Sequence, residues 1–490
     1  MEIFKLRIIK NKVMKNLKII FIGFFLALVS FGCSDDFLER LPPDALPAEG
    51  FLNADRAELA VNAVYATLQT YELYSNTLSK LYDPPTGDAI LVNTSGYGFN
   101  NFQYTTADPH LMEVYSALYE GVFRANIVIN DVPEIEMDAD LRGRYVGEAK
   151  FLRALYYWHL TTLWGDVPLF TEPVEVPSDA LIAKTSREEI YSVMIQDLED
   201  AEAALPLKSS YSASDVGRAT KGAAQALLGK VYLYKKNSDL QAEEWFSKVI
   251  ESGEYDLVDD YGDIININAE NNKESIFEVQ FAETGQADLG TFRVAYNNPQ
   301  VNGGTGNTLP TQQMVDAYES NDPRLNHTIF MEGEEFAPDL GDDLATYKSV
   351  WSSTGYNLKK GLFPVMYVNN RGTNFPVIRY ADVLLMYAEV ANQLSMIDEA
   401  RNAVNKVRKR VDMPLLTPAE TGTQGAMFEA IVHERRVELA YEFHRFNDLK
   451  RWGLAEEFLG PLGYKPRHRY YPLPQEEIDI NDLLEQRTGW

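Results

Sequence analysis

Residues Leu227–Phe246 read LLGKVYLYKKNSDLQAEEWF, and this stretch decides the fold that we expect. The spacing L-G-x-x-Y begins at Leu228, and Ala242 stands four residues before Phe246. Small residues at such positions let two consecutive helices approach closely, and a large side chain fills the gap beside them. The stretch therefore predicts a pair of packed helices.

A second copy of this pattern occurs at Leu385–Val407, LMYAEVANQLSMIDEARNAVNKV. There Ala388, Ala400 and Val404 take the corresponding small and large positions. These spacings are elements of a tetratricopeptide repeat, with one extra residue in the first copy. Two degenerate copies favour tetratricopeptide-repeat-like helical pairs inside one globular body over a full solenoid.

The rest of the chain also has mostly helical periodicity. One apolar face of a helix is predicted wherever apolar residues recur three and four positions apart. This spacing is found at Ala60–Tyr71, Leu152–Leu163, Ala224–Val231, Leu384–Ala391 and Ala400–Val411. Strand-like stretches are few and short, and SIFEVQF at Ser275–Phe281 is the clearest. We therefore predict a mostly α protein.

The N-terminus reads as an export signal. The apolar run Ile19–Phe31 is too short for a comfortable membrane span of about 20 residues, but it suits the apolar region of a signal peptide. Lysines precede it, and Gly32 and then Cys33, the single cysteine of the chain, follow it. This end resembles a bacterial lipobox, whose cysteine carries the lipid anchor. A plain secretory signal with a coincidental cysteine is the alternative, and translation starts at Met1 or Met14.

We accordingly divide the chain into a lipoprotein signal peptide (1–32), a lipidated tether (33–50) and a body (51–490). The tether contains three prolines, which favour an extended linker. Acidic residues follow the cysteine directly, as in the surface-export signal of Bacteroidetes lipoproteins (Asp35, Asp36 and Glu39). The predicted location is the outer membrane, exposed at the cell surface.

Charge and motif content exclude several functions. The formal net charge is −27, so a nucleic-acid partner, which requires a basic face, is excluded. One cysteine permits neither an intramolecular disulfide nor a cysteine-rich zinc site. The six histidines have no H-E-x-x-H spacing, and no G-x-S-x-G motif occurs. We therefore predict no metal site, no cofactor and no catalytic residue.

Five motifs together resemble the SusD/RagB family of nutrient-binding outer-membrane lipoproteins. They cover essentially the whole mature chain in the family's order: EAKFLRALYYWHLTTLWGDVPLF (148–170), ESIFEVQF (274–281), RYADVLLMYAEVANQ (379–393), ERRVELAYEFHRFNDLKRWG (434–453) and YYPLPQEEIDIN (470–481). The resemblance implies a tetratricopeptide-like helical fold with ligand-binding loops. It also implies delivery of a glycan, or sometimes a peptide, to a SusC-like TonB-dependent transporter. A repeat scaffold that binds only proteins and a secreted glycan hydrolase are the alternatives.

Two segments, 72–112 and 282–376, are rich in Gly, Asn, Thr, Pro and aromatic residues, and we expect them to form the working surface. A sugar-binding site needs flat aromatic side chains that pack against the C–H faces of the sugar and polar side chains that bind its hydroxyls. We expect ligand contacts first from Tyr97, Tyr296 and Trp351, and also from Tyr82, Asp88 and Asn101. The same segments offer Phe99, Asn100, Arg293, Asn297 and Tyr356. The alternative is that these aromatics only pack the loops onto the helices.

Two conspicuous polar residues have structural interpretations. Arg435 interrupts an apolar helical row in ERRVELAYEFHRF, so we expect it to be buried and paired with a carboxylate such as Glu438 or Asp448. His159 lies in the apolar row of another predicted helix, and we expect it to be a hydrogen-bonded core residue.

Overall fold

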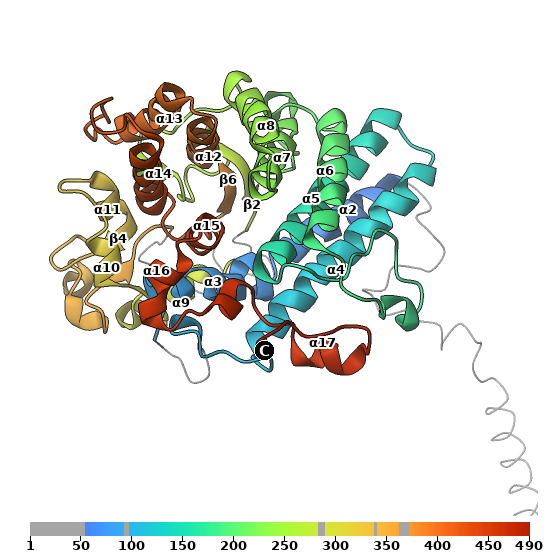
Figure 1. Cartoon of the computed structure of the whole chain (residues 1–490), viewed down its shortest axis with the longest axis horizontal. Coiled ribbons are helices and arrows are strands. Elements are labelled where there is room, and N and C mark those ends of the chain that lie inside the picture. The colour runs from blue at the N-terminus through green and yellow to red at the C-terminus, as the bar shows by residue number, and fades with distance from the viewer. Residues whose placement is uncertain (1–53, 93–97, 283–289, 338–340, 362–371) are drawn as a thin grey trace, which may run out of the picture. The chain divides into compact units, whose positions relative to one another are not determined.

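The computed structural model describes residues 54–92, 98–282, 290–337, 341–361 and 372–490. The predicted signal peptide, tether, Cys33 and Tyr97 lie outside these ranges. Residues 54–490 form a single helical body, which confirms the predicted fold class (Figure 1). Among the described helices, none is both long and apolar enough to cross a membrane.

Among the described residues, ten helices of eight or more residues dominate this body. Their bounds are α2 Ala54–Leu68, α4 Pro109–Asp131, α5 Ala139–Leu163, α6 Arg187–Ala204, α7 Lys221–Tyr234, α8 Asp239–Glu251, α12 Tyr380–Gln393, α13 Ile397–Arg410, α14 Gln424–Glu438 and α15 Arg445–Trp452. From α4 to α8 each helix contacts the next, and α8 contacts α12 although a long segment separates them in sequence. The helices therefore form one continuous array, with residues 252–379 inserted into it (Figure 1).

Side-chain caps fix where several of these helices begin. Asp138, Ser186, Thr220 and Thr423 each accept a hydrogen bond from the backbone N–H three residues later. Such a cap satisfies one of the N–H groups that the first turn of a helix leaves without a partner, and contributes roughly 1 kcal/mol. The residues at which these helices begin are therefore specified by the local sequence.

The helix pair α7–α8 shows the predicted close approach. A Cβ atom built on Gly229 would lie only 2.5 Å from the Phe246 ring, so only glycine permits this contact. Ala242 and Phe246 of α8 are fully buried against α7. In the pair α12–α13, Ala388, Ala400 and Val404 are likewise fully buried. The tetratricopeptide-like interpretation of both stretches is confirmed.

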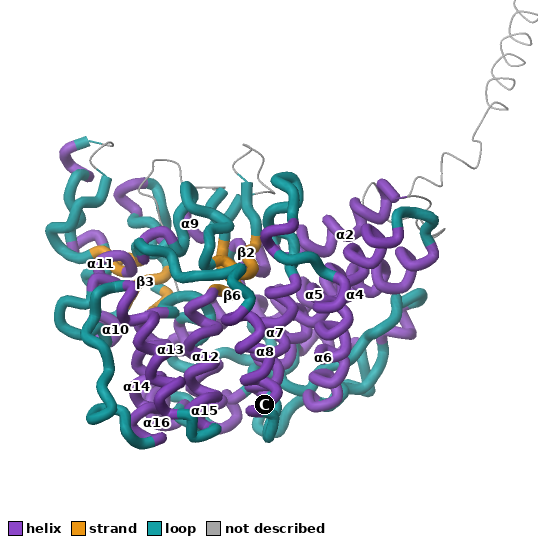
Figure 2. The backbone as a smooth tube through the Cα atoms, turned by 90° about the horizontal axis from the view of Figure 1, so that it is seen from above, coloured by secondary structure: helices purple, strands orange, loops and turns teal. Residues whose placement is uncertain are grey.

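The two segments rich in Gly and Asn fold into short elements rather than long loops. The elements are α3 Thr77–Tyr82, β1 Ala89–Leu91, α9 Arg293–Asn297, β3 Thr308–Pro310, α10 Gln312–Val315, α11 Pro323–Thr328, β4 Ile329–Phe330, β5 Asn357–Leu358 and the start of β6 Phe375–Arg379. Within the described ranges, three two-stranded antiparallel sheets form: β1 with β3, β4 with β5, and β6 with β2 (Ser275–Val279). Figure 2 shows the strands, with α9 and α11, gathered on one side of α7, α8, α12 and α13.

One helix boundary differs from the prediction. The apolar spacing placed Tyr71 on the first helix, but α2 ends at Leu68 and Tyr71 begins a π-helical turn, η2 (Tyr71–Ser75). Within that turn Leu73 has non-helical backbone angles. Periodicity alone could not reveal this break, because Tyr71 still falls on the expected spacing.

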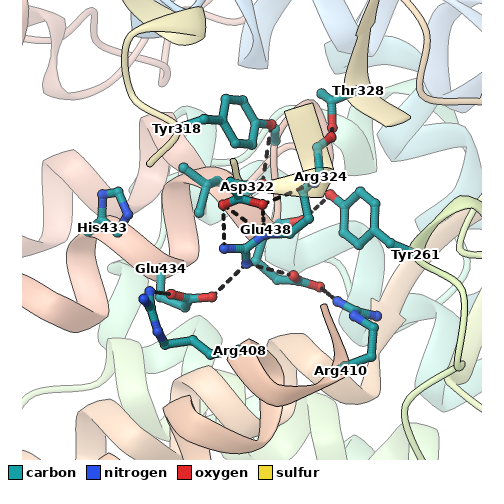
Figure 3. Close-up of polar contacts among 12 residues, drawn as sticks. Tyr261, Tyr318, Asp322, Arg324, Thr328, Arg408, Arg410, His433, Glu434 and Glu438 are labelled. Carbon is teal, nitrogen blue, oxygen red and sulfur yellow. Dashed lines mark hydrogen bonds and ion pairs between the residues drawn. The ribbon is translucent and has the colours of Figure 1, made fainter. Parts of the chain in front are cut away.

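A buried ion-pair network attaches the inserted segment to the helical array (Figure 3). Arg324 of α11 is fully buried and pairs with Asp322 (2.7 Å), Glu434 (2.6 Å) and Glu438 (3.1 Å). Glu438 of α14 also accepts from Arg379 (2.7 Å) and Arg410 (2.5 Å). A fully buried carboxylate is thus shared by three guanidinium groups that come from three different elements.

The electrostatics of Glu438 follow from this geometry. Burial alone would raise its pKa, but Arg410, Arg379 and Arg324 together lower the pKa well below its usual value. The group is therefore ionised, and its charge is compensated only because the three elements are assembled. The network makes the position of α11 depend on α13 and α14.

Arg435 and His159 have the structural roles expected for them. Arg435 is buried and donates to Asp448 (2.9 Å) and Asp382 (3.0 Å). Asp448 is one of the two partners proposed from the sequence, whereas Glu438 belongs to the network around Arg324. His159 is 4% exposed, with Nε2 2.6 Å from the Tyr74 hydroxyl and Nδ1 2.9 Å from the Tyr82 hydroxyl.

Candidate functional site

A cavity of about 220 Å³ lies between η2, α3, the start of α4, α9 and β3. We call it the tyrosine pocket. Its polar and aromatic lining consists of Tyr71, Asn76, Lys80, His110, Glu113, Tyr296, Asn307 and Thr308. These residues come from both of the Gly- and Asn-rich segments and from the two residues that flank the first of them, Tyr71 and Glu113. Residues of both segments therefore line the same cavity.

Local pairing brings the two segments together. Strand β1 pairs with β3 in antiparallel register, with Ile90 opposite Leu309. The Ser75 hydroxyl accepts a hydrogen bond from the backbone N–H of Phe292 at 2.9 Å. Because η2 and the start of α9 are joined in this way, their aromatic side chains face each other.

Two tyrosines form one wall of the pocket. The hydroxyl oxygens of Tyr71 and Tyr296 lie 2.5 Å apart, and their ring centroids are 6.1 Å apart at an interplanar angle of 63°. Phe292 supports Tyr71 edge-on at 5.4 Å between ring centroids. Both tyrosines are half-buried, so the contacts hold their rings in place while part of each remains accessible.

Charged side chains surround this aromatic pair. The Lys80 ammonium lies 5.7 Å from the Tyr71 ring centroid and 5.6 Å from that of Tyr296. Burial lowers the pKa of Lys80, and Glu113 partly opposes the shift. His110 Nδ1 lies 2.9 Å from the Glu113 carboxylate, and burial followed by the charge of Lys80 lowers the pKa of His110. The pocket therefore combines a cation with a carboxylate close to two aromatic rings.

Two amide side chains in the pocket have unused hydrogen-bonding capacity. Asn76 Nδ2 and Asn307 Oδ1 are buried and have no hydrogen-bond partner among the described residues. Buried polar atoms are almost always paired with protein, water or ligand. Here one atom is a donor and the other an acceptor, which is the combination that a hydroxyl group satisfies. The pocket is thus suited to a ligand with several hydroxyl groups.

Of the six residues predicted to contact ligand, Tyr296 lies in this pocket. Tyr82 and Asp88 lie elsewhere, and their surroundings argue against a binding role. Tyr82 is 1% exposed and stacks on Phe443 at 5.2 Å between ring centroids. Asp88 is 6% exposed and its carboxylate pairs with the guanidinium of Arg436 at 2.5 Å. Neither side chain has a free face for a ligand, because α3 and β1 are packed into the core rather than exposed as a loop.

Asn101 and Trp351 do not line the tyrosine pocket, and Tyr97 lies outside the described residues. Asn101 is exposed. Trp351 is half-buried and packs edge-on against Phe336 and Tyr347.

Most of the other candidate residues in these segments are buried or make hydrogen bonds and ring contacts within the protein. Phe99 is fully buried. The Asn100 side chain donates to and accepts from the backbone of Leu91. The Arg293 guanidinium lies over the Phe375 ring at 4.2 Å, and Asn297 is 7% exposed. Tyr356 donates to the Gln312 side chain. For these residues the alternative of simple packing is the better account.

Eight lining residues were missed from the sequence: Tyr71, Asn76, Lys80, Leu91, His110, Glu113, Asn307 and Thr308. Tyr71 was placed on the face of the first helix, and the charged residues belong to helices α3 and α4. Asn307 lies in NGGTGNT, which belongs to the second Gly- and Asn-rich segment but contains no aromatic residue. The only usable signal was the density of Tyr and Asn in TYELYSN, directly after the first predicted helix.

The array of paired helices, with a polar and aromatic pocket in the layer beside it, has a tetratricopeptide-like fold. Residues 36–233 match a family described as starch-binding and associating with the outer membrane, and residues 273–468 match the SusD family. The starch-binding protein SusD of Bacteroides thetaiotaomicron is 30% identical over 459 residues, which cover 77% of this chain and 78% of SusD. The chain belongs to the SusD family.

Other relatives cover more of the chain. The SusD-like protein P25 of Formosa agariphila is 28% identical, over 94% of this chain and 96% of its own. Among solved structures, a laminarin binding SusD-like protein is 29% identical with a TM-score of 0.76, covering 90% of this chain and 100% of its own. A SusD superfamily protein from Bacteroides vulgatus is 25% identical with a TM-score of 0.78, covering 89% and 98%.

Proposed function

We propose that this protein binds a glycan and that the tyrosine pocket is part of the binding site. The observation that carries the proposal is the pairing of Tyr71 and Tyr296 beside Lys80, with an unpaired donor on Asn76 and an unpaired acceptor on Asn307. Similarity to a starch-binding protein and to a laminarin binding protein supports the same ligand class.

The chemistry of a sugar matches this lining. The apolar C–H face of a pyranose ring packs against an aromatic ring, and its hydroxyls both donate and accept hydrogen bonds. In this pocket the tyrosine rings would provide the apolar contact, whereas Lys80 and the two amides would bind hydroxyls. Tyr97, which is outside the described residues, remains a proposed contact, as do Asn101 and Trp351, which do not line the pocket.

Replacing Tyr296 with alanine should weaken glycan binding by about 1 to 3 kcal/mol, the usual loss for a truncated aromatic anchor. A glycan array that includes starch and laminarin identifies the ligand, and isothermal titration then compares wild type with Tyr296→Ala and Tyr71→Ala. Tyr232→Ala, which truncates a half-buried tyrosine outside the pocket, is the matched control. Unchanged affinity in both pocket variants, with normal melting, would remove the tyrosine pocket from the site.

A peptide array and a protein pull-down, run beside the glycan array, separate the alternatives. A protein that binds peptides but no glycan on the arrays would be a peptide-binding member of the family. Binding to proteins alone would instead indicate a repeat scaffold.

We propose that the protein does not turn its ligand over. Glycoside hydrolysis commonly uses two carboxyl groups placed roughly 5 to 10 Å apart across the scissile bond. Glu113 is the one carboxylate in the described lining of the tyrosine pocket, and it already contacts His110. That arrangement supports binding without hydrolysis.

We also propose that Cys33 carries a lipid that anchors the protein to the outer membrane, on the cell surface, after removal of residues 1–32. Cys33→Ala should then leave the membrane fraction, and metabolic labelling with a palmitate analogue should disappear. Continued labelling of the Cys33→Ala variant would disprove the anchor. Protease treatment of intact cells tests the surface exposure.

The proposed partner is a SusC-like TonB-dependent transporter that receives the ligand. Membership of the SusD family supports this partner, as does the description of the matching family as associating with the outer membrane. No nucleic-acid partner or cofactor is part of the proposal.

A further inference from the structure

A second cavity, of about 210 Å³, lies where the C-terminal ends of α5, α7 and α12 meet α15 and the start of α6. We call it the basic pocket. Its lining includes six cationic side chains: Arg187, Lys235, Lys236, Lys450, Arg451 and Arg469. It shares no lining residue with the tyrosine pocket. Such a concentration of positive charge is unexpected in a chain with a net charge of −27.

The carboxylates in this pocket do not balance the cations. Asp239 and Glu389 are the two carboxylates of its described lining. Glu389 accepts from Arg451 through both oxygens, so it is already paired. Among the described residues, no carboxylate oxygen lies within 4 Å of Lys235, Lys236, Lys450 or Arg469. Positive charge therefore remains uncompensated in the pocket.

The burial of Lys450 makes this excess of positive charge energetically unfavourable. Its side chain is 5% exposed, and its ammonium donates to the backbone oxygen of Thr162 at 3.0 Å and lies 4.1 Å from the Phe446 ring centroid. Burial, followed by the charges of Arg469 and Arg187, lowers the pKa of Lys450 well below its usual value. A buried ammonium without a counter-charge is unfavourable. The Thr162 carbonyl, in the last turn of α5, accepts from only one of the three N–H donors of the lysine.

Guanidinium groups also converge on one tyrosine of this pocket. Arg187, Arg469 and Arg487 lie 5.9, 5.9 and 4.8 Å, respectively, from the Tyr470 ring centroid. The Nε atoms of Arg187 and Arg487 are buried and have no hydrogen-bond partner among the described residues. Guanidinium groups of like charge repel one another, so their convergence around Tyr470 favours an anion nearby.

We propose that the basic pocket binds a tetrahedral oxyanion, a sulfate or phosphate group. Arginine and lysine together provide the N–H donors that such a group accepts, and its charge would offset the excess that Lys450 and its neighbours carry. The cavity exceeds the roughly 10 to 15 Å³ that a single water needs. The group is therefore either a free anion or a substituent on a larger molecule.

The test is calorimetric titration of the full chain in detergent, at constant ionic strength, with sodium sulfate, sodium phosphate and glucose 6-sulfate. Wild type should bind at least one of these, with chloride as the reference. The double variant Lys235→Gln/Lys236→Gln should weaken that binding about tenfold, since both lysines border the pocket and neither pairs with a carboxylate. Both side chains are at least partly exposed, so the fold should be unaffected.

Lys221→Gln/Lys409→Gln is the matched control, because it removes the same charge outside the pocket. Tighter binding of glucose 6-sulfate than of sulfate would identify a substituent on a sugar, whereas equal or weaker binding would identify the free anion. Tyr296→Ala should leave either result unchanged, so this test is independent of the tyrosine pocket. The proposal fails if none of the three probes binds, or if both double variants lose the same affinity. The cations would then serve only to cap the helix ends.

Discussion

Replacing Glu438 with glutamine should lower the free energy of unfolding by about 3 to 5 kcal/mol, the range expected when one member of a buried ion network is neutralised. The substitution keeps the shape of the side chain but removes the charge shared by Arg324, Arg379 and Arg410. All three guanidiniums are nearly or fully buried, so water cannot replace the lost carboxylate.

Chemical denaturation followed by circular dichroism measures this effect. Glu429→Gln is the matched control, because it makes the same change on an exposed position of the same helix. The control should change the stability by no more than about 0.5 kcal/mol. Equal stability of Glu438→Gln and Glu429→Gln would show that the network contributes little to holding α11 in place.

The second large effect concerns His159 and pH. Burial, followed by the charge of Lys230, lowers the pKa of His159 to about 3, whereas an unfolded histidine has a pKa of about 6.5. Between these values the unfolded chain binds one more proton than the folded chain at this position. The contribution of His159 to stability is therefore present above pH 6.5 and is lost as the pH falls.

The measurement compares wild type with His159→Gln at several pH values. At pH 7 the wild type should be more stable, because the imidazole bonds to the hydroxyls of Tyr74 and Tyr82. That advantage should shrink by roughly 2 to 3 kcal/mol between pH 6.5 and 4.5, at about 1.4 kcal/mol per pH unit. The comparison with His159→Gln is needed because burial also raises the pKa of Asp83 to about 7. Asp83 therefore makes the folded protein more stable as the pH falls, and this opposite effect cancels when the two proteins are compared.

A constant difference between the two proteins over this range would contradict the assignment of His159 as a buried neutral group. His327→Gln, at a histidine whose side chain is 40% exposed, controls for the general effect of losing an imidazole.

The candidate site was only partly predictable. Tyr296 could be proposed because aromatic and amide residues cluster around it in the sequence. Tyr82 and Asp88 lie in a stretch of similar composition, yet both are buried in the core. Tyr82 is the last residue of α3, and Asp88 directly precedes β1. Tyr71 follows helical periodicity and was assigned to the first helix, although the helix ends before it. Composition identified the segments, but it could not show which side chains within them face solvent.

The basic pocket was not predictable from any local pattern. Its cations come from positions as far apart as Arg187 and Arg469, and each is unremarkable in its own segment. The sequence shows only a strongly acidic chain. An excess of positive charge at one place appears when helix ends that are distant in sequence are packed together.

The sequence by itself determined the helical class, the two repeat-like helix pairs and the structural roles of Arg435 and His159. These properties depend on short-range spacing, on caps within three residues, and on the rule that buried polar groups are paired. Only the tertiary structure decided the pairing of Tyr71 with Tyr296 and the sharing of Glu438 by three arginines. Both arrangements require contacts between segments more than 50 residues apart, as between Arg379 and Glu438 at a separation of 59 residues. No local pattern encodes such contacts, because they depend on how the whole helical array packs.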